Sequence, residues 1–280
     1  MNRREFLVGS LATAGLAGCG AFNGCRRQKP VAVQLWNLNK VFWDDPARYL
    51  SELKAAGYDG VEFAGWAKRG EKDTPAAEVR RLLSDSGLVG AGAHVNGKAN
   101  WVGDGLKRML DYCAEVGVES CTLPWYMTSG KAGWDEFIDF MGKAADEGVR
   151  RGIRIGFHNH YHEFEQKIGD ELVWDYVFRN ASPNLMQQVD TAQAIKAGVD
   201  PLTLLKRYPT RNWYVHIKEN RPNEKRPNDP TTPVDLAAIK GYLDADPMHR
   251  WYILEAEYDP TSVAPSVELL RTFSAAGGQT

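Results

Sequence analysis

Three consecutive stretches decide the fold: residues 31–36 read VAVQLW, residues 45–57 read DPARYLSELKAAG, and residues 60–64 read GVEFA. The first and third are short apolar runs, typical of strands that are covered on both faces. The middle stretch opens with Asp45 and Pro46, which favour the start of a helix, and it ends at Gly57. Because Leu50 and Leu53 share one helical face, we predict a strand, an amphipathic helix and a parallel strand.

The same unit recurs along the chain. Further predicted strands lie at residues 88–94, 119–123, 153–158, 185–189, 213–218 and 251–255. Further predicted helices lie at residues 74–87, 106–116, 134–151, 172–178, 201–207, 234–243 and 266–273. Eight such units close most naturally into a single-domain (β/α)8 TIM barrel, for which 280 residues suffice. An open, doubly wound sheet is the alternative, but no glycine-rich nucleotide loop follows the first strand.

The composition limits the possible partners. The formal net charge is -2 and charges of both signs are interspersed, so no basic field is present to attract nucleic acid. After the N-terminal region, no apolar stretch is long enough to span a bilayer. We therefore expect a soluble body that acts on a small molecule.

The N-terminus differs from the rest. Residues 2–7 (NRREFL) resemble a twin-arginine export motif, in which an arginine pair precedes an apolar pair. Residues 8–18 form a weakly apolar Gly/Ala-rich stretch that is too short for a membrane span. Residues 16–19 (LAGC) resemble a lipobox, in which Cys19 is acylated and becomes the mature N-terminus. These features predict a bacterial lipoprotein that is exported to the periplasm or cell surface.

We accordingly divide the chain into an export signal and tether over residues 1–29 and a barrel over residues 30–280. Cys113 and Cys121 are one helix-to-strand step apart. An oxidising compartment would permit a disulfide between them, but neither their spacing nor their number requires one. We interpret both as buried thiols.

Residues suited to acid–base or metal chemistry lie at or just past the predicted strand ends, where a TIM barrel builds its active site. These residues are Glu62, His94, His158, His160, Glu163, Asp190, His216, Lys218 and Glu255. Such oxygen and nitrogen ligands suit Mn²⁺, Co²⁺, Zn²⁺ or Mg²⁺ better than a metal that prefers thiolates. We therefore expect one divalent metal ion as cofactor.

The order of several short motifs resembles that of the sugar phosphate isomerase/epimerase (xylose isomerase-like) TIM barrels. The motifs are residues 57–62 (GYDGVE), 158–160 (HNH), 190–191 (DT), 197–201 (AGVDP), 215–218 (VHIK) and 253–255 (ILE). Each motif is short, but together they cover nearly all of the chain after the leader. The resemblance implies the barrel fold and chemistry on a sugar.

The resemblance also implies a set of metal ligands. In ketose epimerases of that family, Glu, Asp, His and Glu from strands five to eight hold one divalent ion. Asp190, His216 and Glu255 match the last three. Relatives with a Glu-Asn-His end to strand five place the first ligand where this chain has His158. Either His158 coordinates the ion or Glu163 reaches back from the following loop, and we favour Glu163 because a carboxylate could also act as a base.

Other residues receive supporting roles, each with a structural alternative. Glu62 and His94 are expected to orient ligands or substrate, although Glu62 could pair with a buried base and His94 could be a packing histidine. Asp190 could instead cap the segment after strand six. Lys218 is expected to hold a substrate oxygen.

Four tryptophans lie at or just past the ends of the first four strands: Trp36, Trp66, Trp101 and Trp125. Flat rings at the rim of a site can stack on the apolar faces of sugar rings, although loop packing would also explain them. Together they favour a substrate of glycoside size over a small phosphorylated sugar.

These features predict proton abstraction next to a sugar carbonyl, with the metal stabilising the resulting charge. Glu163 or His160 would be the base, and Glu255 a ligand and possible acid. Since sugar phosphates are cytoplasmic, an exported protein favours keto-sugars or 3-keto-glycosides, with elimination as first choice over epimerisation or isomerisation. One alternative is a non-catalytic sugar-binding lipoprotein. An apurinic endonuclease-like phosphodiesterase is disfavoured because Gln193 stands where those enzymes have an additional histidine.

Overall fold

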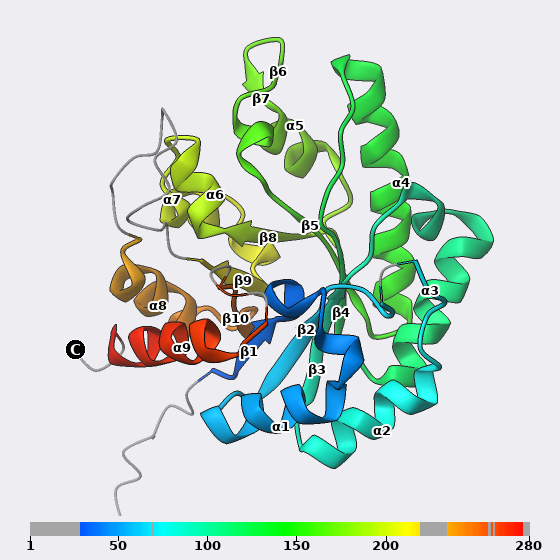
Figure 1. The fold of residues 1–280 in the computed structure, drawn as a ribbon. Helices are drawn as coiled ribbons and strands as arrows, with labels where there is room; N and C mark the ends of the chain where they lie inside the picture. The colour runs from blue at the N-terminus through cyan, green and yellow to red at the C-terminus, as the bar shows by residue number, and fades with distance from the viewer. Residues whose placement is uncertain (1–28, 69, 219–233, 257–258, 260, 277–280) are drawn as a thin grey trace, which may run out of the picture.

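The computed structural model describes residues 29–68, 70–218, 234–256, 259 and 261–276. Within these residues, eight parallel strands form a closed barrel in the order β1-β10-β9-β8-β5-β4-β3-β2 (Figure 1). The strands are β1 (Val31–Gln34), β2 (Gly60–Phe63), β3 (Val89–His94), β4 (Ser120–Leu123), β5 (Arg154–His158), β8 (Met186–Asp190), β9 (Tyr214–Ile217) and β10 (Trp251–Leu254). The predicted TIM barrel is confirmed, and closure by pairing of β1 with β10 excludes the open sheet.

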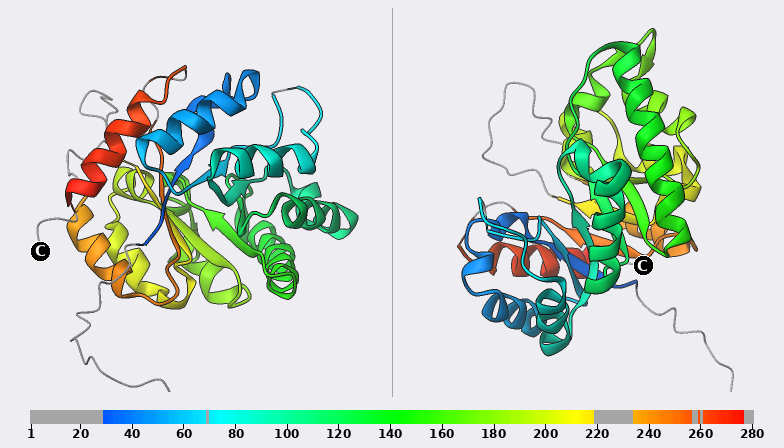
Figure 2. Two further views of the ribbon diagram at one scale, coloured as in Figure 1. Left: turned by 90° about the horizontal axis from the view of Figure 1, so that it is seen from below. Right: turned by 90° about the vertical axis from the view of Figure 1, so that its right-hand side faces the viewer.

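Helices surround the barrel, as the further views in Figure 2 show. They are α1 (Pro46–Ala56), α2 (Ala76–Ser86), α3 (Gly103–Val116), α4 (Gly130–Arg150), α5 (Val173–Asn180), α6 (Thr191–Lys196), α7 (Pro201–Arg207), α8 (Leu236–Ala245) and α9 (Ala264–Ala276). The sequence did not predict the hairpin β6 (Lys167–Ile168) and β7 (Glu171–Leu172) or the short 3-10 helices, which include η3 (Lys98–Trp101) and η4 (Tyr161–Phe164). The predicted export signal lies outside the described residues.

Local chemistry fixes the first helix as the sequence predicts. The Asp45 carboxylate accepts a hydrogen bond from the backbone N–H of Arg48 at 3.2 Å, and Pro46 occupies the first turn. Gly57 ends the helix with a φ of 107°, a conformation that favours glycine. The Tyr58 hydroxyl then donates to the backbone oxygen of Ser266 at 2.7 Å, which joins the first and last units of the ring.

Large apolar side chains fill the amino-terminal half of the barrel interior. Trp251 and Tyr214 are buried there, in a cluster separate from the main core between strands and helices. The Tyr214 hydroxyl accepts a hydrogen bond from Thr122 at 2.9 Å. It also lies 1.9 Å from where a Cβ on Gly156 would be, so only glycine fits at that position of β5. This packing leaves the carboxyl-terminal half of the barrel for polar side chains.

Two further expectations concern the body of the protein. Cys113 and Cys121 are buried free thiols with their Sγ atoms 2.8 Å apart, which agrees with their interpretation as buried thiols. No helix within the described residues combines the length and apolar character that crossing a bilayer requires.

Candidate functional site

Strand alternation carries the polar residues into the carboxyl-terminal half of the barrel. Successive side chains of a strand point to opposite faces, so residues two apart share a face. On β9, the buried Tyr214 of the interior cluster is followed on the same face by His216, and on β8 Met186 is followed by Gln188 and Asp190. All three of these polar residues are buried. The apolar cluster in the amino-terminal half of the barrel and the layer of polar side chains above it, here called the polar layer, therefore come from the same strands.

Glu62 lies at the centre of this polar layer. Its carboxylate accepts hydrogen bonds from Gln34 Nε2 at 2.5 Å and from Gln188 Nε2 at 2.7 Å. Burial favours the neutral acid, but the imidazoles of His94 and His216 outweigh it and lower the pKa of Glu62. Glu62 is 0 % exposed and does not line the pocket described below. Its contacts in the structure are with neighbouring side chains, and its role towards a substrate stays a prediction.

His216 lies between two carboxylates. Its Nε2 is 2.6 Å from Glu62 Oε2, and its Nδ1 is 3.0 Å from Glu255 Oε2. Burial alone would lower the pKa of His216, but Glu62 and Glu255 raise it to about 10. On the other side, the Lys218 ammonium donates to Glu255 Oε1 at 2.9 Å. The Glu255 carboxylate is therefore held between the His216 imidazole and the Lys218 side chain.

The Gln188 amide connects Glu62 to two more imidazoles. Because a carboxylate only accepts hydrogen bonds, the amide nitrogen must face Glu62 and the amide oxygen must face away. That oxygen lies 2.8 Å from His94 Nε2 and 3.1 Å from His158 Nδ1. Burial and the nearby His216 hold the pKa of His158 well below 6.5, so its ring is neutral. With Nδ1 donating to Gln188, the Nε2 atom of His158 carries a lone pair.

Asp190 uses its two oxygens differently. Oδ1 accepts a hydrogen bond from the backbone N–H of Gln193 at 2.9 Å and caps α6, as the structural alternative anticipated. Oδ2 is buried and has no hydrogen-bond partner, but it lies 3.8 Å from His158 Nε2. Burial raises the pKa of Asp190 to about 6. An unpaired carboxylate oxygen facing an imidazole lone pair is an arrangement that a bound cation would satisfy.

Two groups of described residues are close enough to hold a metal ion. One comprises Asp190, His216 and Glu255, and the other comprises His94, His158 and His216; within each group the ligand atoms lie within 4.8 Å of one another. Ligands on opposite sides of one ion lie roughly 4 Å apart, since each bond measures about 2.0–2.2 Å. The first group offers the oxygen and nitrogen donors that Mn²⁺, Co²⁺, Zn²⁺ and Mg²⁺ accept. The buried residues therefore fit a divalent ion.

Glu163 departs from its predicted place. It belongs to η4, where its Oε2 accepts the backbone N–H of His160 at 2.8 Å and its Oε1 lies 2.8 Å from His162 Nε2. Neither metal-ligand group found among the described residues includes it. Because Glu163 is the third residue of a short helix, it folds back to cap that helix and does not reach the barrel axis. The geometry favours the alternative first ligand, His158.

His160 faces the pocket from the end of β5. Burial, with a contribution from the neighbouring His162, lowers the pKa of His160 to about 3. Its side chain takes part in the capping box at the start of η4, together with that of Glu163. Trp125 packs edge-on against its ring at 4.5 Å between centroids, and Glu163 holds its backbone. His160 is therefore a neutral imidazole in a fixed position.

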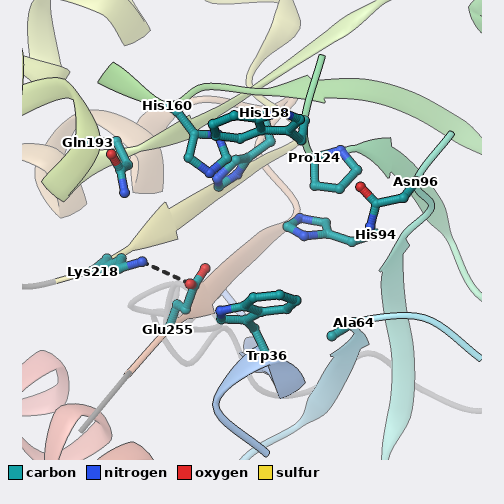
Figure 3. Close-up of a pocket in the computed structure, with 11 residues that line it drawn as sticks. Trp36, Ala64, His94, Asn96, Pro124, His158, His160, Gln193, Lys218 and Glu255 are labelled. Carbon is teal, nitrogen blue, oxygen red and sulfur yellow. Dashed lines mark hydrogen bonds and ion pairs between the residues drawn. The ribbon is translucent and has the colours of Figure 1, made fainter. Parts of the chain in front are cut away.

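A cavity of about 450 Å³ opens above these groups (Figure 3). Its lining residues are Trp36, Ala64, His94, Asn96, Pro124, Trp125, His158, His160, Gln193, Lys218 and Glu255. The volume falls in the range of ligand pockets, about 300–1,000 Å³. In Figure 3 the imidazoles of His158 and His160 face Lys218 and Glu255 across the cavity. The pocket is thus lined by the candidate base His160, by the candidate ligands His158 and Glu255, and by the basic side chain of Lys218.

The four tryptophans separate into two pairs. Trp36 and Trp125 line this cavity and are 49% and 47% exposed, as stacking rings would be. Trp101 is 0% exposed and its Nε1 donates to the backbone oxygen of Val95, because η3 turns the ring into the core. Trp66 is also buried and borders a different cavity. The predicted role of Trp101 in substrate binding is therefore wrong, and Trp66 lines a cavity other than the one that Trp36 and Trp125 share.

The sequence did not indicate several neutral residues of the site. Gln34 and Gln188 orient Glu62, while Asn96 and Gln193 line the pocket. Amides do not titrate, so they give no acid–base signal. The position of Gln188 could nevertheless be predicted, because Gln188 precedes Asp190 by two residues and must therefore lie on the same face of β8.

The raised pKa of His216 predicts how the stability of the metal-free protein depends on pH. The folded protein keeps this proton up to about pH 10, whereas an unfolded chain loses it near 6.5. The stabilisation is complete below about 6.5 and is lost as the pH rises to about 10. We expect the melting temperature, followed by circular dichroism in a chelator, to fall across this window. His216→Gln should flatten the slope, and an unchanged slope would contradict the assignment.

Comparisons with known proteins agree with this architecture. A family model described as a xylose isomerase-like TIM barrel matches residues 50–273. Among solved structures, a sugar phosphate isomerase/epimerase from Parabacteroides distasonis superposes with a TM-score of 0.70 at 19% identity, covering 94% of this chain and 99% of that one. An L-ribulose 3-epimerase superposes with a TM-score of 0.60 at 14% identity, covering 88% and 86%. At such identities, these two structures support the fold alone.

Curated relatives match a shorter region. An inosose dehydratase from Geobacillus kaustophilus is 28% identical over 151 residues, which are 47% of this chain and 48% of the relative. The chain thus spans about half the length of the curated relatives it matches.

Proposed function

Because the chain belongs to the xylose isomerase-like TIM barrel family, we propose that it is a divalent-metal-dependent enzyme that removes a proton from the carbon next to a sugar carbonyl. The convergence of Asp190, His216 and Glu255 carries this proposal, since they meet beneath a pocket that also presents a neutral imidazole. Candidate metal ligands beneath the cavity and an unprotonated imidazole in its wall are the groups needed to remove a proton from the carbon next to a carbonyl.

Four residues would hold the metal: Asp190, His216, Glu255 and, as the strand-five ligand, His158. A bound divalent ion would stabilise the negative charge that develops on the carbonyl oxygen. Although burial opposes it, Lys218 and His216 keep the pKa of Glu255 well below 4.5. Glu255 therefore suits the role of ligand better than that of the acid suggested by the sequence.

His160 is the proposed base. Its lowered pKa of about 3 leaves it unprotonated at neutral pH, and its ring lines the pocket. Glu163 would be a positioning residue, because it touches the backbone of His160 and lies outside the pocket lining. Lys218 lies on the pocket wall and would donate to a substrate oxygen.

Elimination is our first choice of reaction, ahead of epimerisation or isomerisation. The relatives named inosose dehydratases support it, since a dehydratase eliminates water. Exposed Trp36 and Trp125 at the pocket support a ring-shaped substrate. We propose keto-sugars or 3-keto-glycosides as substrates.

Turnover by the metal-loaded protein tests the proposal. We expect a 3-keto-glucoside to release its aglycone and the unoxidised parent glucoside to be inert, because only the ketone acidifies the neighbouring C–H bond. Dialysis against a chelator should remove activity, and re-addition of Mn²⁺ should restore it. Cleavage of the unoxidised glucoside at a comparable rate would contradict the mechanism. Sugar binding without turnover of any ketone would favour the alternative of a binding protein.

We also propose that the protein is exported through the twin-arginine route and anchored by lipid on Cys19, as residues 2–19 suggest. Arg3→Lys combined with Arg4→Lys should block export of the full chain, measured by cell fractionation. Cys19→Ala should abolish incorporation of labelled fatty acid. Labelling that persists in Cys19→Ala would rule out the lipobox.

A further inference from the structure

A second cavity of about 460 Å³ lies beside the first. His94 and Asn96 belong to both linings, so the two cavities are neighbours. Along the loop after β2, Ala64 borders the first cavity and Gly65 borders the second. Because both residues are small, neither carries a long side chain between the two cavities.

The second cavity combines aromatic and hydrogen-bonding groups. Trp66 and Tyr112 form an aromatic wall, with ring centroids 4.8 Å apart and planes at 50°. Asp73, Asn100 and Arg108 add both acceptors and donors. Among the residues that the structure describes, Arg108 and Asp73 form no hydrogen bond or ion pair with other side chains, although both are exposed. Their polar groups are available to a ligand.

We propose that this second cavity binds the leaving group of a glycoside and that this leaving group is a neutral sugar ring. The inference rests on the proposed function, because the first cavity must hold the ring that carries the carbonyl. A neutral polyol matches one positive and one negative side chain beside two asparagines, Asn96 and Asn100. An anionic group would meet Asp73, and a flat apolar group would make no hydrogen bonds with these side chains.

The reaction remains balanced with a sugar as leaving group. His160 takes the proton from the carbon next to the carbonyl, and a carbon–carbon double bond forms. The bond from the adjacent carbon to the glycosidic oxygen breaks, and its electron pair stays on that oxygen. Water protonates the oxygen, so the products are an unsaturated keto-sugar and a free sugar, with no oxidant or reductant consumed.

Two substrates that differ only in the second ring test this inference: methyl 3-ketoglucoside and cellobiose oxidised at carbon 3 of its non-reducing glucose. We expect the wild-type protein to prefer the disaccharide in kcat/KM. Arg108→Ala should raise KM for the disaccharide about tenfold, the effect of one hydrogen bond to a charged group, and leave the methyl glycoside within twofold. Lys107→Ala, an exposed change at the adjacent residue of α3 outside both linings, is the matched control.

Calorimetry with unoxidised cellobiose and methyl glucoside separates binding from chemistry. Cellobiose should bind more tightly, and Arg108→Ala should remove the difference. Equal binding of the two sugars, or equal losses on both ketones in Arg108→Ala, would overturn the second site and leave the proposed function intact. If methyl 3-ketoglucoside is not turned over while cellobiose binding still depends on Arg108, the proposed function fails and the second site stands.

Discussion

Replacement of Asp190 by asparagine is expected to weaken binding of the divalent ion by more than about 100-fold and to abolish turnover. Loss of a residue that merely supports a ligand typically costs about 10–100-fold, and loss of a charged ligand should cost more. Asparagine caps helices as well as aspartate does, so α6 should keep its N-terminal hydrogen bond from Gln193. Metal content measured by mass spectrometry and affinity measured by titration calorimetry give the result.

A matched control separates the loss of the ligand from the loss of the cap. Asp200 caps α7 in the same manner, through the backbone N–H groups of Leu202 and Thr203, but it is exposed. Asp200→Asn should therefore retain the metal and full activity. If Asp190→Asn bound the ion as tightly as the wild-type protein, Asp190 could not be a ligand.

Replacement of His160 by alanine should lower kcat by about 10²–10⁴-fold, the usual contribution of a positioned general base, without loss of the metal. The ring faces the pocket, but it lies in neither group of candidate metal ligands among the described residues. Steady-state kinetics on a 3-keto-glucoside, together with metal content, provide the two readouts.

His249→Gln is the control for removal of a buried imidazole. His249 is buried, and its Nδ1 lies 3.0 Å from the backbone oxygen of Asn212, outside the pocket lining. The substitution His249→Gln should leave kcat near the wild-type value. Unchanged kcat in His160→Ala would remove this residue from the mechanism, and a parallel loss of metal would make it a ligand instead.

The barrel could be predicted because its signals are local and repeated. Each strand is a short continuous apolar run, and each helix has a periodic apolar face that must pack on those strands. The order of these units leaves few ways to bury both surfaces. The same regularity placed Asp190, His216 and Glu255 at neighbouring strand ends, and the structure brings these three residues together.

The loops did not follow from the sequence, because short 3-10 helices have no apolar periodicity. The cap in η4 turns Glu163 onto the backbone of His160, and η3 buries Trp101. Glu163 and Trp101, which the sequence predicts at strand ends facing the site, therefore point away from it. Asp190 shows a different limit: helix capping and metal binding both favour aspartate after a strand, and each of its two oxygens suits one of these roles.

Isotope exchange tests the central claim most directly, because abstraction of a proton next to a carbonyl exchanges that proton with solvent. The measurement is mass spectrometry and proton NMR of the sugar recovered after partial reaction of a 3-keto-glucoside in D₂O with the Mn²⁺-loaded protein. If the base returns the proton before the leaving group departs, deuterium should appear at the carbon next to the carbonyl in recovered substrate. If departure is faster, the substrate deuterated at that carbon should react several-fold more slowly. The account would be contradicted if the aglycone were released with neither exchange nor an isotope effect, and if the unoxidised glucoside reacted at the same rate.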